Sequence, residues 1–451
     1  MKAKTAFWAM IAILLLFVSM IGYSTTAKNR VIEKLVTDIT GYKIGNNPPQ
    51  IYLLYPPPDA KVRCATELIW FAIDPDRDKL VFNVYIGETP ESMEFVGKTT
   101  KNVFKLNLEP DKEYFWMIEV FDGKEYVRSP VRSFLTEREM QQQPAYNWTY
   151  ILYMDGDNDL YSYALSELNE IKNSSLKNMA VIILFDGNEE NDTWLYVIDN
   201  GIEKTTLGEK NMGSSKTLED LLLYAKENYV AKNYILEIWG HGNGWMGICF
   251  DATNTDMLTM AEIENALTAA GGVDIVIFSA CYMGCAEVAY SLKNVADYMI
   301  ACEGAMPAAG LPHNEILKAI GELRAEDVCK KIVDVYGEYV FLSTSFAAWN
   351  LSKMSYLLAT INEFIYSHAV NVTEARNESA YCLQYIDLKN FAEYIGCEEI
   401  VEAINETIIS SCGMLSGVGI YFPVKGQCSK YYPDTEFSSA SLWDEFMSNY
   451  V

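Results

Sequence analysis

The chain is poor in histidine and in basic residues. Its 451 residues include only three histidines, and 61 aspartates and glutamates outnumber 35 lysines and arginines, which gives a net charge of −26. Binding to nucleic acid depends on clustered lysines and arginines that contact phosphates, so this composition argues against a nucleic-acid partner. We find no internal repeat and no low-complexity tract, which excludes a solenoid and a compositionally biased chain.

The chain does contain enough apolar sequence for a large core. Half of its residues are hydrophobic, which for this length predicts two or three folded domains. At the N-terminus, Lys2 and Lys4 precede an apolar run over residues 6–22. We interpret residues 1–28 as a signal peptide or a membrane anchor, and the sequence leaves its cleavage open. The chain is therefore predicted to be secreted or held at the cell surface.

Ten cysteines are compatible with disulfide formation in such an oxidising location. Pairing cannot be deduced from spacing alone. We select Cys412 with Cys428, and Cys382 with Cys397, as the pairs to test.

Residues 47–136 alternate between apolar and polar side chains in a way that is typical of β-strands. The segments 80–85, 103–106 and 114–120 are the clearest strands, and residues that favour turns separate them. Their spacing predicts an antiparallel β-sandwich, and the region resembles a fibronectin type III domain. Such a domain commonly serves as a spacer or a docking module. The polar residues 137–146 are interpreted as a linker.

Two short apolar segments, each predicted to be a strand, are followed by a residue with a reactive side chain. Residues 235–239 lead to His241, which glycines flank, and residues 275–278 lead to Cys281. In an open α/β sheet, side chains beyond the carboxyl ends of neighbouring parallel strands converge on one crevice. The pattern therefore predicts a Cys/His nucleophilic site. The alternative is a structural turn histidine and an inert cysteine, because a free cysteine often behaves as a small hydrophobic residue.

Longer segments around both residues resemble the clostripain family of cysteine peptidases. Residues 238–245 and 279–290 carry most of the resemblance. Residues 154–160 and 417–423 resemble the end of the family's first strand and one of its late strands. The resemblance covers residues 147–451, which we interpret as a clostripain-like peptidase domain.

The resemblance implies a caspase-like α/β fold, in which helices flank a mainly parallel sheet. It implies that Cys281 is the nucleophile and that His241 is the general acid/base. It also implies that the backbone N–H groups of Gly242 and Cys281 hold the oxyanion of the tetrahedral intermediate. The expected activity is hydrolysis of peptide bonds in a polypeptide substrate, and the sequence requires no cofactor for it.

The residues expected in the substrate pocket differ from those of relatives that cleave after arginine or lysine. Such relatives carry an acidic residue two positions before the nucleophile, where this chain has Ser279, and a second acidic position falls at Ala309. Without both carboxylates a buried cation would be unpaired, at a cost of about 3 to 5 kcal/mol. We therefore predict a pocket for small or apolar side chains. His313, expected in the same loop, is either a substrate contact or an ordinary polar residue.

The aspartate-rich residues 155–159 resemble a calcium-binding loop only superficially. Leu160 stands where an EF-hand loop needs glycine, and Ser166 stands where it needs a bidentate glutamate. The sequence therefore identifies no metal ligands. Calcium bound in another geometry is compatible with the resemblance, because some clostripain relatives depend on it.

A second hypothesis is a catalytically inactive cell-surface protein that binds a polypeptide through a degenerate peptidase domain. Retention of both His241 and Cys281 argues against it. The two hypotheses differ in the expected reactivity of Cys281, since an activated thiol reacts faster than an ordinary one.

Overall fold

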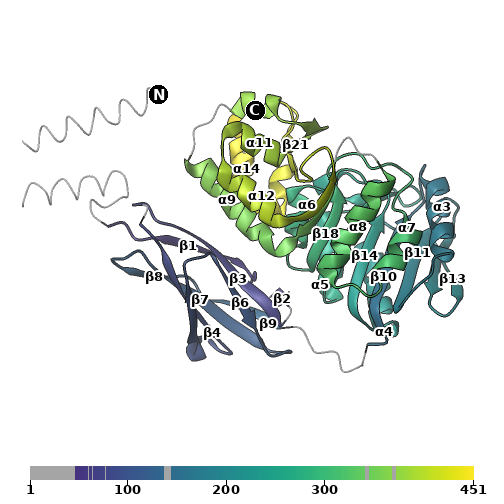
Figure 1. Ribbon diagram of the computed structural model, residues 1–451, viewed down its shortest axis with the longest axis horizontal. Helices are drawn as coiled ribbons and strands as arrows, with labels where there is room; N and C mark the ends of the chain where they lie inside the picture. Colours follow the sequence, from purple (N-terminus) through teal and green to yellow (C-terminus); the bar gives the residue numbers. More distant parts are fainter. Residues whose placement is uncertain are drawn as a thin grey trace, which may run out of the picture. The chain divides into compact units, whose positions relative to one another are not determined.

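The computed structural model describes residues 46–136, apart from Asp59, Arg63 and Arg77, and residues 144–450, apart from 341–344 and 368–371. The predicted signal peptide or anchor lies outside the described residues, as do residues 137–143 of the predicted linker. Within the described ranges, no helix combines the length and the apolar character needed to span a bilayer. The described chain forms an all-β region and a larger α/β region (Figure 1).

The N-terminal region consists of β-strands in two sheets. Its strands are β1 (Gln50–Tyr55), β2 (Ala60–Val62), β3 (Ala65–Ile73), β4 (Val81–Gly87), β5 (Glu94–Thr99), β6 (Val103–Asn107), β7 (Glu113–Phe121), β8 (Tyr126–Arg128) and β9 (Arg132–Thr136). One sheet has the order β1-β3-β6, and the other has the order β2-β9-β7-β4-β5, with β8 paired to β7. Alternate side chains of β7 are buried, and Trp70, Trp116 and Phe134 are completely buried. The predicted all-β domain is confirmed.

The C-terminal region is built on a nine-stranded sheet. In spatial order its strands are β13 (Ile202–Gly208), β12 (Thr193–Ile198), β11 (Met179–Asp186), β10 (Tyr146–Asp155), β14 (Ala231–Trp239), β17 (Val273–Ser279), β18 (Ala296–Cys302), β19 (Ser345–Asn350) and β22 (Ile408–Gly413). The central strands from β11 to β18 are parallel, and the outer strands are antiparallel to their neighbours. The predicted mainly parallel sheet is confirmed at the centre, and the hairpin edge expected at residues 194–198 is β12.

Helices cover both faces of this sheet, because the side chains of each strand point alternately to opposite sides. One core contains side chains of α3 (Tyr161–Lys172), α7 (His313–Ile320) and α8 (Ala325–Tyr339). The other core receives side chains from α4 (Ser215–Asn228), α5 (Met260–Ala269), α6 (Ala286–Leu292), α9 (Met354–Ser367), α10 (Val372–Glu378), α11 (Leu388–Ile395), α12 (Glu398–Thr407), α13 (Glu436–Ala440) and α14 (Trp443–Tyr450). Helix α5 begins with a capping box, in which Thr259 and Glu262 each accept the other's backbone N–H.

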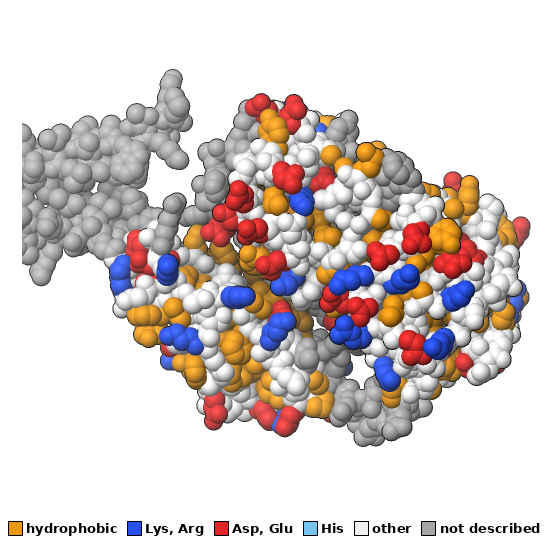
Figure 2. All heavy atoms as spheres, in the orientation of Figure 1, with side chains coloured by type: hydrophobic (Ala, Val, Ile, Leu, Met, Phe, Trp, Pro, Cys, Tyr) orange, Lys and Arg blue, Asp and Glu red, His pale blue; other side chains and the backbone are white. Residues whose placement is uncertain are grey.

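Two small sheets lie outside the large one. Strand β15 (Ile248–Asp251) pairs with β16 (Asp256–Leu258), and β21 (Tyr385–Asp387) pairs with β20 (Tyr381–Cys382) and β23 (Gly419–Tyr421). The late strand expected within residues 417–423 is β23, which therefore belongs to a small sheet. On the face shown in Figure 2, lysine and arginine side chains lie among acidic ones.

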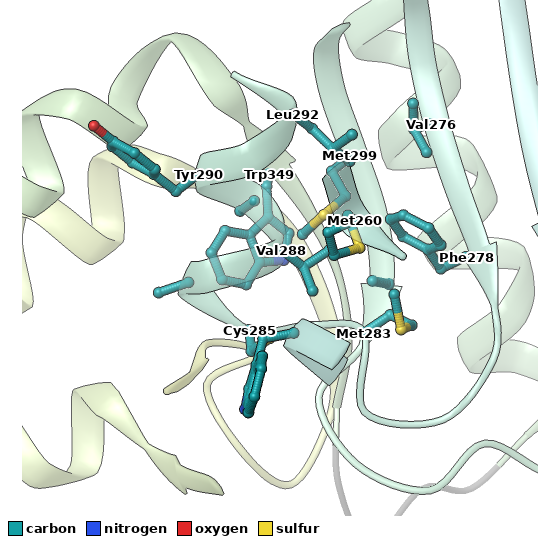
Figure 3. Packing of buried hydrophobic residues seen from close by; sticks show 14 of the residues in the cluster. Met260, Val276, Phe278, Met283, Cys285, Val288, Tyr290, Leu292, Met299 and Trp349 are labelled. Atoms are coloured by element: carbon teal, nitrogen blue, oxygen red, sulfur yellow. The ribbon is translucent and has the colours of Figure 1, made fainter. Parts of the chain in front are cut away.

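Figure 3 shows the core between the sheet and helices α5 and α6, where Phe278, Met260 and Val288 pack in one cluster. Cys285 lies in the same cluster and is completely buried. Burial raises the pKa of the Cys285 thiol well above its ordinary value. This thiol is therefore an inert core residue, although it follows Cys281 closely in the sequence.

The two selected disulfide pairs are not formed in this structure. Cys397, Cys412 and Cys428 are all free thiols. Cys412 lies on the edge strand β22 and packs beside Gly337 of α8. Cys428 lies in the exposed loop that follows β23, in a different part of the fold.

Candidate active site

Strands β14 and β17 end beside each other. In their parallel register Trp239 pairs with Ser279, so the chain leaves both strands at the same edge of the sheet. His241 follows the end of β14 at the same distance in sequence as Cys281 follows the end of β17. The structure therefore brings these two residues to neighbouring strand ends, where open α/β sheets form their crevice.

Gly242 lies directly against the backbone of Cys281. A Cβ atom added at Gly242 would be 2.2 Å from the carbonyl oxygen of Cys281 and 3.1 Å from its backbone nitrogen. Because these separations are shorter than van der Waals contact, any side chain there would push the two loops apart. Glycine thus permits the histidine loop to approach the backbone of the cysteine.

The backbone N–H groups of Gly242 and Cys281 have no hydrogen-bond acceptor among the described residues. The neighbouring turn is closed by the N–H of Asn243, which donates to the carbonyl oxygen of Gly247 at 2.9 Å. The thiol of Cys281 is only partly buried. Two unpaired donors beside an accessible thiol can hold a negatively charged oxygen.

The loop after β18 contacts the Cys281 thiol directly. The backbone N–H of Met306 donates to the sulfur at 3.3 Å, and the thiol lies 3.7 Å from the carbonyl oxygen of the same residue. Ala309, a predicted pocket residue, lies further along this loop and is exposed. The structure therefore places the Ala309 loop beside the cysteine.

His241 has a carboxylate partner that the sequence analysis missed. Its Nε2 lies 2.6 Å from Oδ1 of Asp159, in the loop after β10. The hydrogen bond to His241 lowers the pKa of Asp159. The signal for this contact was the run 155–159 itself, because it follows a strand that neighbours β14 in the parallel sheet.

Ser279 is buried and takes part in a polar network beneath the strand ends. Its hydroxyl donates to Glu237, a completely buried residue of β14. The hydroxyl of Tyr150 donates to the same carboxylate at 2.5 Å, and Nε2 of His313 lies 2.8 Å from it. Burial alone would raise the pKa of Glu237, but the charge of His313 and the three hydrogen bonds together outweigh burial and lower the pKa.

The loop position expected for His313 is wrong. His313 is the first residue of α7, and its side chain is completely buried. Its two ring nitrogens face different carboxylates, since Nδ1 lies 3.3 Å from Glu167 and Nε2 faces Glu237. Burial alone would lower the pKa of His313, but these carboxylates raise it to about 9.

The same geometry decides what the Glu167, Glu237 and His313 cluster can do. A metal ion binds an imidazole through one nitrogen, whereas here each of the two ring nitrogens faces a different carboxylate. The cluster is therefore centred on the ion pair between Glu237 and His313, with Glu167 facing the second ring nitrogen. Glu167 also accepts a hydrogen bond from the indole of Trp239 at 2.8 Å, which ties the network to the end of β14.

A second acidic cluster is formed where the chain leaves β10, β11 and β13, and its oxygens are close enough together to hold a cation. Oxygens of Asp157, Asp186 and Glu209 all lie within 4.8 Å of one another. Oδ2 of Asp186 is buried and has no hydrogen-bond partner. Burial, followed by the charges of neighbouring carboxylates, raises the pKa of Asp186 to about 8. Calcium prefers hard oxygen ligands, and these carboxylates would supply part of the roughly six to eight oxygens that it takes.

The family model described as the clostripain family matches residues 152–411. The chain belongs to the clostripain family. Clostripain from Hathewaya histolytica is 30% identical over 229 residues, which are 40% of this chain and 44% of that protein. The chain thus spans less than half the length of this clostripain-family relative.

Two solved structures of C11 proteases share the fold. An inactive zymogen C11 protease from Parabacteroides distasonis has a TM-score of 0.56 and 20% identity, and covers 66% of this chain and 99% of its own. A secreted C11 cysteine protease from Bacteroides thetaiotaomicron, in complex with an irreversible peptide inhibitor, has a TM-score of 0.57 and 21% identity, with the same coverage. Together with the clostripain-family match, they confirm the predicted family and its α/β fold.

Proposed function

We propose that the chain is a cysteine endopeptidase, with residues 147–451 as its peptidase domain and residues 47–136 as an accessory sandwich. The observation that carries the proposal is the approach of Gly242, next to His241, to the backbone of Cys281 at neighbouring strand ends. Family membership supports the same reaction class. No observation favours an inactive binding protein.

In the proposed reaction, the Cys281 sulfur attacks the carbonyl carbon of the scissile peptide bond, and the thiol proton passes to His241. The unpaired N–H groups of Gly242 and Cys281 hold the resulting oxyanion. His241 then gives its proton to the leaving amine as the carbon–nitrogen bond breaks. Water hydrolyses the thioester and restores the thiol.

We further propose that the substrate pocket accepts small or apolar side chains. Ser279 presents a hydroxyl that is already bonded to Glu237, and the charge of Glu237 is matched by His313. A basic substrate side chain would need an unengaged carboxylate near this position. Cleavage after apolar residues is therefore expected to exceed cleavage after arginine or lysine.

The proposed place of action is outside the cytoplasm, secreted or at the cell surface. The basic and apolar N-terminal sequence supports export. One structural relative is described as secreted. A polypeptide is the proposed partner.

Calcium is proposed as a structural ion held by Asp157, Asp186 and Glu209. The unpaired oxygen of Asp186 supports this proposal, because this buried carboxyl group ionises fully at neutral pH only beside a positive partner. When bound, the ion would supply positive charge that offsets the repulsion among these carboxylates. Asp157 also accepts the backbone N–H of Thr253 at 2.6 Å, so the ion would connect two loops beside His241.

The test is cleavage of a mixed peptide library by the full chain, by Cys281→Ala and by Cys428→Ser. Cys428 is an exposed thiol in another loop, so its replacement controls for loss of a cysteine. We expect cuts after small or apolar residues that persist in Cys428→Ser and vanish in Cys281→Ala. Cleavage that survives in Cys281→Ala would overturn the proposed function, and cuts mainly after arginine or lysine would overturn the proposed specificity.

A further inference from the structure

The aspartate-rich loop after β10 carries a charged group that the proposed mechanism does not use. Oδ1 of Asp159 lies 2.6 Å from Nε2 of His241. The side chain of Asp159 is 84% exposed, and an exposed aspartate carboxylate accepts hydrogen bonds, so the ring nitrogen is the donor in this contact. We propose that Asp159 is a positioning residue that orients His241 toward Cys281, an inference that rests on the proposed function.

The loop that carries Asp159 is tied to the strand that follows the histidine turn. The side-chain amide of Asn158 donates to the carbonyl oxygen of Phe250 at 3.3 Å. In the same strand, β15, the N–H of Cys249 donates to the carbonyl oxygen of His241 at 3.0 Å. One strand therefore braces both the loop with the carboxylate and the turn with the imidazole.

The ends of β10 and β14 also pack closely. Gly240 borders Asp155, since a Cβ added at Gly240 would lie 3.5 Å from the Cβ of Asp155. The amide of Asn158 donates to Oδ2 of Asp155 at 3.1 Å, which shapes the loop just before Asp159. The close packing of these strand ends and the shape of the loop together bring the carboxylate of Asp159 to the ring of His241.

The chemistry assigns separate tasks to the two ring nitrogens of His241. With the Nε2–H group donated to Asp159, Nδ1 is left to take the thiol proton of Cys281 and to return it to the leaving amine. The ionised Asp159 stabilises the imidazolium that forms between these two transfers. The carboxylate takes no proton and forms no covalent bond.

If Asp159 and His241 formed only a structural ion pair, loss of the carboxylate would lower thermal stability and leave turnover unchanged. The side chains of His241 and Asp159 are 46% and 84% exposed, so their attraction is screened by water and contributes little to folding. Loss of the carboxylate should therefore leave thermal stability unchanged. Its effect should be on turnover.

The experiment compares the full chain with Asp159→Asn, Asp159→Glu and Glu190→Gln, using a peptide that wild type cleaves. Glu190 is an exposed acidic residue, so its variant controls for the loss of one negative charge. In Asp159→Asn we expect kcat to fall about 10-fold, with KM within about twofold of wild type and an unchanged melting temperature. Asp159→Glu should recover part of the lost kcat, and Glu190→Gln should match wild type.

The experiment distinguishes failure of the positioning role of Asp159 from failure of the proposed peptidase function. An Asp159→Asn variant with wild-type kcat would overturn the positioning role, provided that Cys281→Ala is inactive. Equal losses of kcat in Asp159→Asn and Glu190→Gln would also overturn it, because net charge would then explain the effect. Cleavage that does not depend on Cys281 would instead overturn the proposed function.

Discussion

Gly242 and Cys281 pack backbone against backbone, with no space for a side chain between them. Gly242 follows His241, so the same contact fixes how closely the histidine turn approaches the nucleophile. The N–H groups of both residues lack acceptors within the described chain. One close approach therefore serves the proposed dyad and the proposed oxyanion site together.

Replacing Gly242 with alanine should separate the two loops. The new Cβ would lie 2.2 Å from the carbonyl oxygen of Cys281, which belongs to rigid backbone. We expect kcat/KM to fall at least about 100-fold, comparable to the loss of an oxyanion donor. Gly201→Ala, where nothing lies within 4 Å of the added Cβ, is the control. Peptidase assays on both variants check this, and normal activity of Gly242→Ala would refute the role of the contact.

The buried network should make stability depend on pH. The pKa of His313 is raised to about 9 in the folded chain, above its ordinary value of 6.5. The folded state therefore binds the proton more tightly, and the resulting stability is complete below about pH 6.5 and is lost as pH rises through 9. The shift corresponds to about 3 kcal/mol.

Thermal melting of the full chain from pH 6 to pH 10 measures this dependence. We expect the melting temperature to fall between pH 6.5 and pH 9, with a shallower slope in His313→Gln. The burial-raised pKa of Glu167, about 8, acts in the same direction. An identical slope in wild type and His313→Gln would contradict the assignment of this pH dependence to His313.

Calcium should stabilise the chain through Asp186. A ligand present at 100 times its dissociation constant adds about 2.7 kcal/mol to the free energy of unfolding, so the melting temperature should rise by several degrees. Asp186→Asn should reduce that rise, whereas Glu203→Gln, an exposed residue of β13, should retain it. Melting curves with calcium and with a chelator test the site, and an equal rise in all three proteins would exclude it.

The strand ends that carry His241 and Cys281 could be predicted because their signals are local. Apolar strands followed by His241 and Cys281, and a capping box at Thr259, are read from neighbouring residues. Parallel pairing then brings strand ends together by a general rule of α/β sheets. The antiparallel outer strands β19 and β22 were not predicted, since their pairing joins distant segments.

The partners within the site could not be predicted in the same way. His313 and Glu237 lie 76 residues apart in sequence, and only the packing of α7 on the sheet brings them together. A signal was nevertheless present, because Glu237 is a lone carboxylate in an apolar strand and must find a buried partner. Asp159 was placed in the end of the family's first strand and in the test for calcium, but not beside His241, since no local pattern links it to a histidine 82 positions away.

The central claim is that Cys281 is the activated nucleophile, and labelling with an irreversible electrophile on a peptide scaffold tests it most directly. Intact-mass and peptide-mapping mass spectrometry of the full chain would locate the adduct and give its rate. We predict one fast adduct on Cys281, which slows at least about 100-fold in His241→Ala. Labelling of Cys281 no faster than that of the exposed Cys428, or a rate unaffected by His241→Ala, would contradict the account.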